Sequence, residues 1–393
     1  MEKKPSTENV STAGLDFPAP VADGLAALRK NIDAIDRQII SLLSRRQAEV
    51  EVILALKKAH NLPVHHPARE EDLISERRRI GTETGLDPDY LEELFRCIMH
   101  QSRVEQTARI AGKGVRPGAT VLLVGGGGGM GRYFFKYFSE AGYHVKSMGR
   151  KDWPDAGKIC QGVELAIISV PIEVTDAVIE KIASFLPPDC VLADLTSIKG
   201  SPMKAMLAKH AGPVIGLHPL FGPSTSTMDK QIVAVTPGRD PEACQWLIDQ
   251  FVIWGGVIVR TTPEEHDEIM ALVQSLRHFA TFTFGQFLWQ RRVNLSRSLE
   301  FSSPIYRLEL GMVGRLFAQD SSLYSEIIFA SPERINLLKS YIASLTGNLS
   351  MLERGDKAAF NEQFGKIAEW FGPFSEQAMR ESTFLIDKLI ERF

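Results

Sequence analysis

An arginine stands in an apolar helical stripe at a position where a leucine would be expected. The stripe repeats every three or four residues through Leu25, Leu28, Ile32, Ile35, Ile39 and Leu42. The same spacing continues to Arg46, and Arg29 and Lys57 lie beside it. A half-buried cation needs a partner, because stranding its charge costs several kcal/mol. Acidic residues such as Glu49 or Glu70 could supply a salt bridge, but three cations on one seam favour a binding site for a small dianion.

A glycine-rich turn further along the chain suits a dinucleotide. Gly126, Gly128 and Gly131 form a GxGxxG pattern between a strand-like run at 121–124 and a helix-like segment at 132–138. Glycine lets the backbone turn tightly and approach a pyrophosphate, whose charge then faces the N-terminus of the following helix. A flexible linker would not have apolar strand and helix patterns on both sides. The pattern therefore predicts the phosphate-binding turn of a dinucleotide-binding domain.

The residues after the next predicted strand, 144–148, bear on which dinucleotide binds. An acidic residue that hydrogen-bonds the ribose 2′-hydroxyl of NAD usually ends this strand. Here the strand is followed by Gly149, Arg150 and Lys151, and the first acid is Asp152. We expect NAD as the cofactor. NADP stays open, because two cations suit a 2′-phosphate, although Asp152 could still serve NAD.

A histidine that follows another apolar run could act on a hydroxyl group. His218 stands at the end of this run, directly before Pro219. An imidazole with an ordinary pKa of about 6.5 can accept the hydrogen of a hydroxyl near neutral pH. Elsewhere, His266 is followed by Asp267 and Glu268, which is not the HExxH pattern of zinc enzymes, so we expect no metal site.

The composition is that of a multi-domain globular protein. The chain has 393 residues, which suggests two or three domains at about 150 residues each. Its net charge of −3 gives no electrostatic reason to expect nucleic acid or an anionic membrane as a partner. The N-terminus lacks the apolar run of a secretory signal, and no run reaches the ~20 apolar residues of a membrane span. Four cysteines without a CxxC pattern suit a reducing compartment, and we expect a cytoplasmic protein.

The patterns divide the chain into a tail, three domains and a linker. Residues 1–22 read as a disordered tail, 23–110 as an all-α domain and 111–118 as a linker. Residues 119–262 alternate between strand and helix and predict an α/β Rossmann-type domain with a parallel sheet. Residues 263–393 predict an all-α domain; a family resemblance implies that it serves substrate binding and dimerisation.

The first domain is predicted to contain three helices, the first of them long. It runs from Leu25 towards Pro63, and the others cover about 67–80 and 88–108. Three helices in about 85 residues cannot bury the long apolar stripe by themselves. An intertwined helical dimer is therefore expected.

Seven polar positions in this first domain carry a resemblance to a known family. In chain order they are Arg29, Arg46, Lys57, Arg69, Glu70, Ser102 and Gln106. The set resembles the all-helical chorismate mutases, which implies rearrangement of chorismate to prephenate without a covalent intermediate. His66 departs from the pattern, since some members of the family carry Asp there.

The mutase resemblance also implies a role for each of these residues. Arg46, together with Arg29 of a partner subunit, would clamp the two carboxylates of chorismate. Lys57 and Gln106 would donate to the ether oxygen as it gains negative charge. Glu70 would hold the ring hydroxyl. The remaining two, Arg69 and Ser102, would support the site.

Residues 119–393 resemble prephenate dehydrogenase. The resemblance is carried by 169–171, 194–199, 216–223, 265–267, 276–279, 303–307 and 314–317. Together the two segments resemble the bifunctional chorismate mutase/prephenate dehydrogenase family of tyrosine biosynthesis. This resemblance implies oxidative decarboxylation of prephenate to 4-hydroxyphenylpyruvate with NAD(P), a homodimer, and tyrosine as a feedback inhibitor.

The dehydrogenase resemblance implies a second set of site residues. His218 would accept a hydrogen bond from the substrate hydroxyl. Ser197 would lie near the nicotinamide and orient His218. Arg315 would bind the ring carboxylate, while Arg307 and His278 would help to hold the substrate. The expected cofactor-binding residues are Gly126, Gly128, Met130, Gly131, Arg150, Ser169, Pro171 and Lys199. Lys199, like His210, could instead belong to a solvated loop.

Two other functions remain open from the sequence. An arogenate dehydrogenase, or a relaxed cyclohexadienyl dehydrogenase with an attached mutase, would need the same residues. A tyrosine-sensing regulatory protein with degenerate sites is disfavoured by the intact mutase set and by intact His218 and Arg315.

Overall fold

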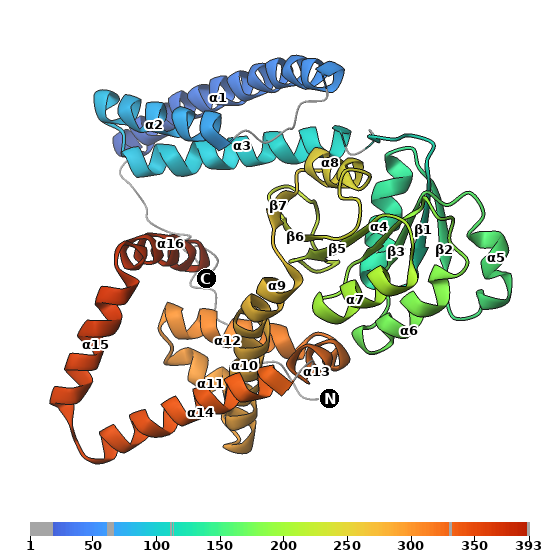
Figure 1. Cartoon of the computed structure of the whole chain (residues 1–393). Coiled ribbons are helices and arrows are strands. Elements are labelled where there is room, and N and C mark those ends of the chain that lie inside the picture. Colours follow the sequence, from blue (N-terminus) through green and yellow to red (C-terminus); the bar gives the residue numbers. More distant parts are fainter. Residues whose placement is uncertain (1–18, 61–66, 111, 113, 330–331, 391–393) are drawn as a thin grey trace, which may run out of the picture. The chain divides into compact units, whose positions relative to one another are not determined.

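The computed structural model describes residues 19–60, 67–110, 112, 114–329 and 332–390 (Figure 1). It divides into two compact units, one ending at Ile110 and the other beginning at Ala111. Most of the predicted tail lies outside the described residues, but 19–22 are helical. None of the described helices is long and apolar enough to cross a membrane.

The first unit is all-helical, as predicted. Its helices are α1 (Ala19–His60), α2 (Pro67–Thr84) and α3 (Pro88–Ile110). Proline at the first position of α2 and of α3 suits a helix start, because the missing N–H would have no partner there. The helices pack through α3, which contacts both α1 and α2.

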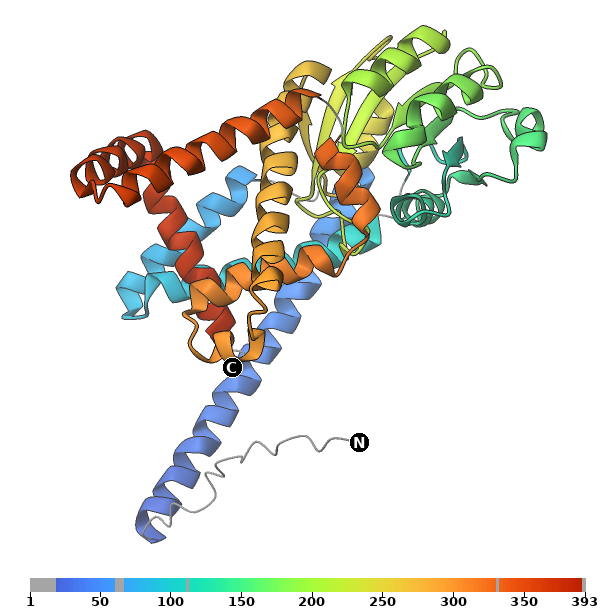
Figure 2. The same cartoon turned by 90° about the horizontal axis from the view of Figure 1, so that it is seen from below.

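The apolar stripe of α1 changes from exposed to buried along the helix. Towards the C-terminus, Val50 and Leu54 are buried. Towards the N-terminus, Leu28 and Ile35 are 59% and 55% exposed, and Figure 2 shows this half of α1 projecting beyond α2 and α3. Within the described residues, the N-terminal stripe therefore lacks a covering partner, as the dimer prediction requires.

The second unit begins with an α/β domain on one seven-stranded sheet. Its strands are β1 (Thr120–Val124), β2 (His144–Met148), β3 (Leu165–Ile168), β4 (Val191–Asp194), β5 (Val214–Pro219), β6 (Ile232–Pro237) and β7 (Val257–Arg260). They lie in the order β2-β1-β3-β4-β5-β6-β7 (Figure 1). The sequence predicted all seven strands but a wholly parallel sheet, and this was wrong at one pair. β6 runs antiparallel to β5, because the 12 residues between them contain no crossover helix.

Helices cover both faces of this sheet. They are α4 (Gly129–Glu140), α5 (Ala156–Ile159), α6 (Ile172–Ala183), α7 (Gly200–Lys209) and α8 (Gln245–Ile253), with a 3-10 turn at Trp153–Asp155. Alternate residues of β1 enter opposite cores, because successive side chains of a strand point to opposite faces. Leu123 packs with Phe138 and Trp254, whereas Leu122 packs with Ile182 and Met206. The central strands β1, β3 and β4 are therefore mostly apolar, as a doubly covered sheet requires. The edge strands β2 and β7 are partly exposed and include Lys146 and Arg260.

The rest of the unit is helical, as predicted from Pro263 onward. The helices are α9 (Pro263–Met270), α10 (Arg277–Gln290), α11 (Leu295–Glu300), α12 (Pro304–Phe317), α13 (Ser321–Phe329), α14 (Pro332–Glu353), α15 (Lys357–Phe371) and α16 (Pro373–Ile390). A π-helical turn, Ala271–Leu276, joins α9 to α10. Thr262 caps α9 by accepting from the Glu265 N–H, which sets where the helix begins.

These C-terminal helices leave much apolar surface uncovered. Trp289, Phe364 and Trp370 are 76%, 64% and 79% exposed. A hollow of about 790 Å³ lies between α10 and α12, with Leu288 and Val313 in its lining. Large apolar side chains exposed in this number among the described residues are typical of a surface that associates with another chain.

Candidate functional site

The first cluster of predicted site residues lies where α1 meets α3. Arg46 Nη1 donates to Ser102 Oγ at 2.8 Å, and the Ser102 hydroxyl donates in turn to the Ile98 carbonyl. Ser102 is buried and Arg46 is half-buried. Ser102 therefore orients the guanidinium of Arg46, and the other N–H groups of that guanidinium are left for a ligand.

The cations of this cluster are partly removed from water. Burial, with the nearby positive charge of Arg77, lowers the pKa of Arg46. Burial also lowers the pKa of Lys57, while the negative charge of Glu70 acts in the opposite direction. A half-buried guanidinium with a second positive charge nearby, as Arg46 has in Arg77, gains from an anion, and a small dicarboxylate would supply one.

Helix α2 contributes a carboxylate, that of Glu70, and α3 contributes an amide, that of Gln106. Glu70 on α2 accepts from Arg103 Nη1 at 2.8 Å, a partner that the sequence had not indicated. Gln106 is buried, and among the described residues its Oε1 has no hydrogen-bond partner. A buried amide oxygen without a partner is costly, so this face of the cluster is polar and ready for a ligand.

Two other predicted mutase residues, Arg69 and Arg29, are exposed, and the position of His66 lies outside the described residues. Arg69 is exposed on α2. Arg29 is exposed on α1, and at 1.5 Å per residue it stands roughly 25 Å along the helix from Arg46. Arg29 therefore cannot join Arg46 of its own chain.

The second cluster begins at the glycine turn between β1 and α4. Gly125 has φ of +89°, a conformation that glycine adopts without strain. A side chain on Gly131 would come within 2.5 Å of the Gly125 carbonyl, so glycine is needed where the helix meets the turn. Gly127 is exposed with open space beside it. Gly128 is the N-cap of α4 and donates its N–H to the Gly125 carbonyl. The first N–H groups of α4, that of Met130 among them, have no partner within the helix and can face a ligand.

An acid does stand at the tip of β2, although three residues later than expected. Asp152 Oδ2 accepts from the Gly149 N–H at 2.7 Å. The chain turns back after Gly149, which brings the carboxylate to the end of the strand. Arg150 and Lys151 are exposed beside it.

The predicted cofactor residues differ in how accessible they are. Ser169 and Pro171 follow β3 at the same sheet edge as the glycine turn and are not buried. Lys199, by contrast, is fully buried: its ammonium binds the Asp194 carboxylate and the Leu217 carbonyl. It therefore does not reach the cofactor turn. His210 is also buried, with Nε2 2.6 Å from the Cys190 carbonyl, so neither residue belongs to a solvated loop.

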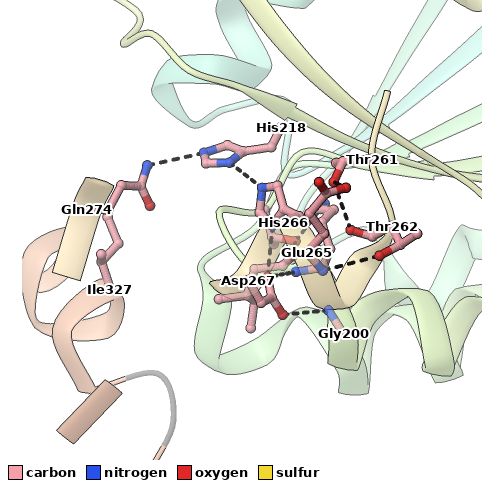
Figure 3. A network of polar contacts seen from close by, with 12 residues as sticks. Gly200, His218, Thr261, Thr262, Glu265, His266, Asp267, Gln274 and Ile327 are labelled. Atoms are coloured by element: carbon pink, nitrogen blue, oxygen red, sulfur yellow. Dashed lines mark hydrogen bonds and ion pairs between the residues drawn. The ribbon is translucent and has the colours of Figure 1, made fainter. Parts of the chain in front are cut away.

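His218 ends β5 and takes part in a buried network of polar contacts (Figure 3). Its Nδ1 lies 2.9 Å from His266 Nε2, and His266 Nδ1 lies 2.8 Å from Asp267 Oδ1. On the other side of the ring, Gln274 Nε2 lies 3.4 Å from His218 Nε2. The two histidines are 4% and 2% exposed. The network joins the sheet to α9 and to the π-helical turn, which carries Gln274.

The electrostatics of this network favour a neutral His218. Burial, then the positive charges of Lys199 and Arg334 and the proximity of His266, hold the pKa of His218 well below its ordinary value, and Asp267 acts in the opposite direction. Burial would raise the pKa of Asp267, but hydrogen bonds from His266 and from the N–H groups of Gly200 and Lys199 lower it on balance. His218 can therefore accept a hydrogen bond over a wide pH range.

The other predicted substrate residues have contacts of their own outside this network. Ser197 follows β4, and its buried Oγ has no hydrogen-bond partner in the described structure, so it does not bond to His218 here. His278 packs edge-on against Tyr324, and burial lowers its pKa to about 4. Arg307 donates to the Leu299 carbonyl, and Arg315 is exposed on α12.

Four residues in or beside the network had no role assigned from the sequence: His266, Asp267, Gln274 and Arg334. His266 and Asp267 were included in the resemblance to prephenate dehydrogenase and considered as a possible zinc motif, and no metal-binding cluster occurs among the described residues. Arg334 on α14 is buried close to the network and donates to the Ile327 carbonyl. The one signal in the sequence for this network was the adjacent pair His266 and Asp267, which follows the capped start of α9.

These positions share one edge of the sheet. The glycine turn, Ser169, Ser197 and His218 follow β1, β3, β4 and β5, which are parallel neighbours. The carboxyl ends of parallel strands form the edge where ligands bind in open α/β sheets. A dinucleotide on the glycine turn would extend along this edge towards His218 and Ser197. The arrangement can transfer a hydride from a hydroxyl-bearing carbon while a histidine takes the hydroxyl hydrogen.

Three segments of the chain match known families. Residues 28–107 match chorismate mutase type II. Residues 148–260 match the nucleotide-binding domain of prephenate dehydrogenase, and 262–366 match its dimerization domain.

Similar proteins cover nearly the whole chain. The T-protein of Enterobacter agglomerans is 42% identical over 365 residues, which are 92% of this chain and 97% of that one. The T-protein of Haemophilus influenzae is 38% identical and covers 93% and 97%. A solved prephenate dehydrogenase from Aquifex aeolicus, in complex with hydroxyphenyl propionate and NAD+, has a similar fold with TM-score 0.50 and 18% identity, over 63% of this chain and 96% of that one.

Proposed function

The chain belongs to the T-protein family, the bifunctional chorismate mutase/prephenate dehydrogenases of tyrosine biosynthesis, and from this membership we propose how its residues serve the two reactions. The first unit is a chorismate mutase of type II, and the second is a prephenate dehydrogenase.

In the mutase, the chain's own side chains bind chorismate from α1, α2 and α3. Arg46, aimed by Ser102, clamps one carboxylate, a task that suits the planar fork of a guanidinium. Lys57 and Gln106 donate to the ether oxygen, where negative charge develops as the bond breaks. Glu70 accepts from the ring hydroxyl and is itself held by Arg103. Partial burial of these groups supports the assignment, because it strengthens each charge interaction.

The mutase site is completed by a second copy of the chain. Arg29 is too far along α1 to reach Arg46 of its own chain, whereas an antiparallel partner helix would bring its Arg29 close. The exposed stripe at Leu28 and Ile35 is the surface that such a helix covers. Exposed apolar side chains on α14–α16 support a second contact in the same homodimer.

In the dehydrogenase, His218 accepts the hydrogen of the prephenate hydroxyl. C4 of prephenate becomes a carbonyl carbon when its hydrogen leaves as a hydride, which bound NAD would accept. The ring carboxylate leaves as CO₂, and the electrons of its bond enter the ring. Ser197 donates to the same oxygen from the end of β4, which its free Oγ supports. Arg315 binds the ring carboxylate, and His278 and Arg307 shape the pocket.

NAD is the cofactor that the chain's own residues favour. The open space at Gly127 and the close packing at Gly131 form a cradle that fits a pyrophosphate. Asp152, held at the tip of β2, accepts from the ribose 2′-hydroxyl and repels a 2′-phosphate. Bound there, the cofactor supplies the hydride acceptor.

The placement of His218 beside the edge that carries the glycine turn is the observation that supports the dehydrogenase assignment best. Steady-state assays with chorismate, prephenate and arogenate, each dehydrogenase assay run with NAD and with NADP, test it. We expect mutase activity, and oxidation of prephenate with NAD preferred. His218→Asn should lower kcat for prephenate about 100-fold or more while the mutase is unchanged. A His218→Asn enzyme with wild-type dehydrogenase activity would contradict the assignment.

A further inference from the structure

The histidine assigned to the substrate hydroxyl ends a chain of three hydrogen-bonded side chains. Asp267 contacts His266 at 2.8 Å, and His266 contacts His218 at 2.9 Å (Figure 3). His266 and Asp267 come from α9, 48 residues or more after His218 in the sequence. Both imidazoles are buried, so water does not compete for their nitrogen atoms.

The direction of each hydrogen bond among these three side chains follows from the carboxylate of Asp267. The ionised Asp267 carboxylate can only accept, and it also accepts from the N–H groups of Lys199 and Gly200 at 2.8 Å each. His266 Nδ1 must therefore carry a hydrogen. A neutral His266 then has its lone pair on Nε2, so His218 donates from Nδ1 and keeps the lone pair of Nε2 on the opposite side.

The contact on that opposite side agrees with this tautomer. Gln274 Nε2 is an N–H donor and lies 3.4 Å from His218 Nε2, a position where only a lone pair is compatible with it. The amide comes from the π-helical turn, a local widening of the helix that is frequent at functional sites. A substrate hydroxyl could take its place.

We propose that His266 and Asp267 are positioning residues that hold His218 in the tautomer whose Nε2 accepts the hydroxyl hydrogen of the substrate. The inference rests on the proposed role of His218 and adds two residues to it. When Nε2 takes the proton, the imidazolium keeps its Nδ1–H on His266, and the carboxylate of Asp267 lies behind it. The proton returns to the product oxygen once the ring is aromatic.

The charges around His218 explain why such support is needed. Lys199, beneath β5, and Arg334, from α14, both oppose a positive charge on His218, and so does a proton on the neighbouring His266. The Lys199 ammonium is already paired with Asp194. Asp267 is the group that acts in the opposite direction. Without its charge, protonation of His218 during the reaction would be less favourable.

Asp267→Asn is the sharpest variant, because it keeps the shape and removes the anion. The Asn oxygen can still accept from the start of α7, where Asn caps a helix as well as Asp does. Oδ1 of Asp267 accepts from both the Lys199 N–H and His266, and Oδ2 accepts from the Gly200 N–H. An NH₂ in place of Oδ1 would face His266 Nδ1 and move its hydrogen to Nε2, whereas an NH₂ in place of Oδ2 would leave the tautomer unchanged. Both orientations remove the negative charge that favours a proton on His218. We expect kcat for prephenate to fall by about 100-fold to 10⁴-fold, with KM changed much less.

Matched variants separate this effect from general damage. Glu265→Gln alters a neighbouring carboxylate that bonds to the Thr261 hydroxyl instead, and it should keep the wild-type rate. His266→Gln keeps an acceptor for His218 and should lose only about 10-fold. Adding Asp267→Asn to His266→Gln should then cost little more, because the chain is already interrupted. Mutase activity and melting temperature report on folding.

Nitrogen NMR of enzyme labelled with ¹⁵N-histidine reads the tautomer directly. The wild-type His218 signals, identified by their loss in His218→Asn, should show hydrogen on Nδ1, and Asp267→Asn should place hydrogen on Nε2 in a larger fraction of the molecules. Multiplicative losses in the double variant, or a wild-type hydrogen on Nε2, would overturn the inference. If His218→Asn itself keeps full activity, the proposed function fails instead, so the two failures are distinct.

Discussion

Arg46 offers the clearest test of the mutase site. Its guanidinium donates one N–H to Ser102, and its other N–H groups are left for a carboxylate. Arg46→Ala removes a charge-assisted bidentate contact in a half-buried place, which is worth about 3 kcal/mol, and about 1.4 kcal/mol corresponds to a tenfold rate change. We therefore expect kcat/KM for chorismate to fall about 100-fold. The assay follows the disappearance of chorismate, with prephenate oxidation measured separately on the same preparation.

Two further variants refine this expectation. Arg45→Ala removes the neighbouring cation, which is exposed on α1, and should leave both activities near wild type. Ser102→Ala keeps Arg46 but frees it, so a loss of about 5-fold is expected from one hydrogen bond of about 1 kcal/mol. Dehydrogenase activity with added prephenate should persist in all three. If Arg46→Ala reduced both activities equally in a folded protein, or reduced neither, the two-site assignment of residues would be wrong.

The remaining predictions concern the dehydrogenase. Arg315→Ala should raise KM for prephenate more than it lowers kcat, because the charge pair exists in the ground state and the transition state alike; an unchanged KM would remove the carboxylate from Arg315. Gly149→Glu, whose Cβ would lie 3.6 Å from Asp152 Oδ2, adds an acid at the tip of β2 and should increase the NAD/NADP ratio of kcat/KM; a constant ratio would show that this tip points to solvent. Because His218 must be unprotonated and its pKa is lowered, kcat/KM should rise with pH through an ionisation below 6.5 and stay level above it. His278→Asn should leave that ionisation in place.

Local patterns in the sequence determined the helices and strands, and they identified part of the residues proposed for binding and catalysis. Short runs indicated all seven strands, most clearly the central ones, because a strand covered on both faces is mostly apolar. The edge strands β2 and β7 are partly exposed and carry Lys146 and Arg260. The glycine turn and His218 were predicted because each lies next to a strand and takes its position from that neighbour alone. The seam of α1 likewise placed Arg46 on the side that faces α3.

Only the tertiary structure decided which distant residues meet. The reversal of β6 relative to β5 could not be read from runs that are equally apolar in either direction. His266 and Asp267 meet His218 across 48 or more residues, and no local periodicity reports such a contact. Lys199 showed the same limit: its sequence neighbours suit a surface loop, yet Asp194 and the Leu217 carbonyl hold it in the core. A buried charge depends on partners that folding brings together, so the sequence named the residue and the fold determined its role.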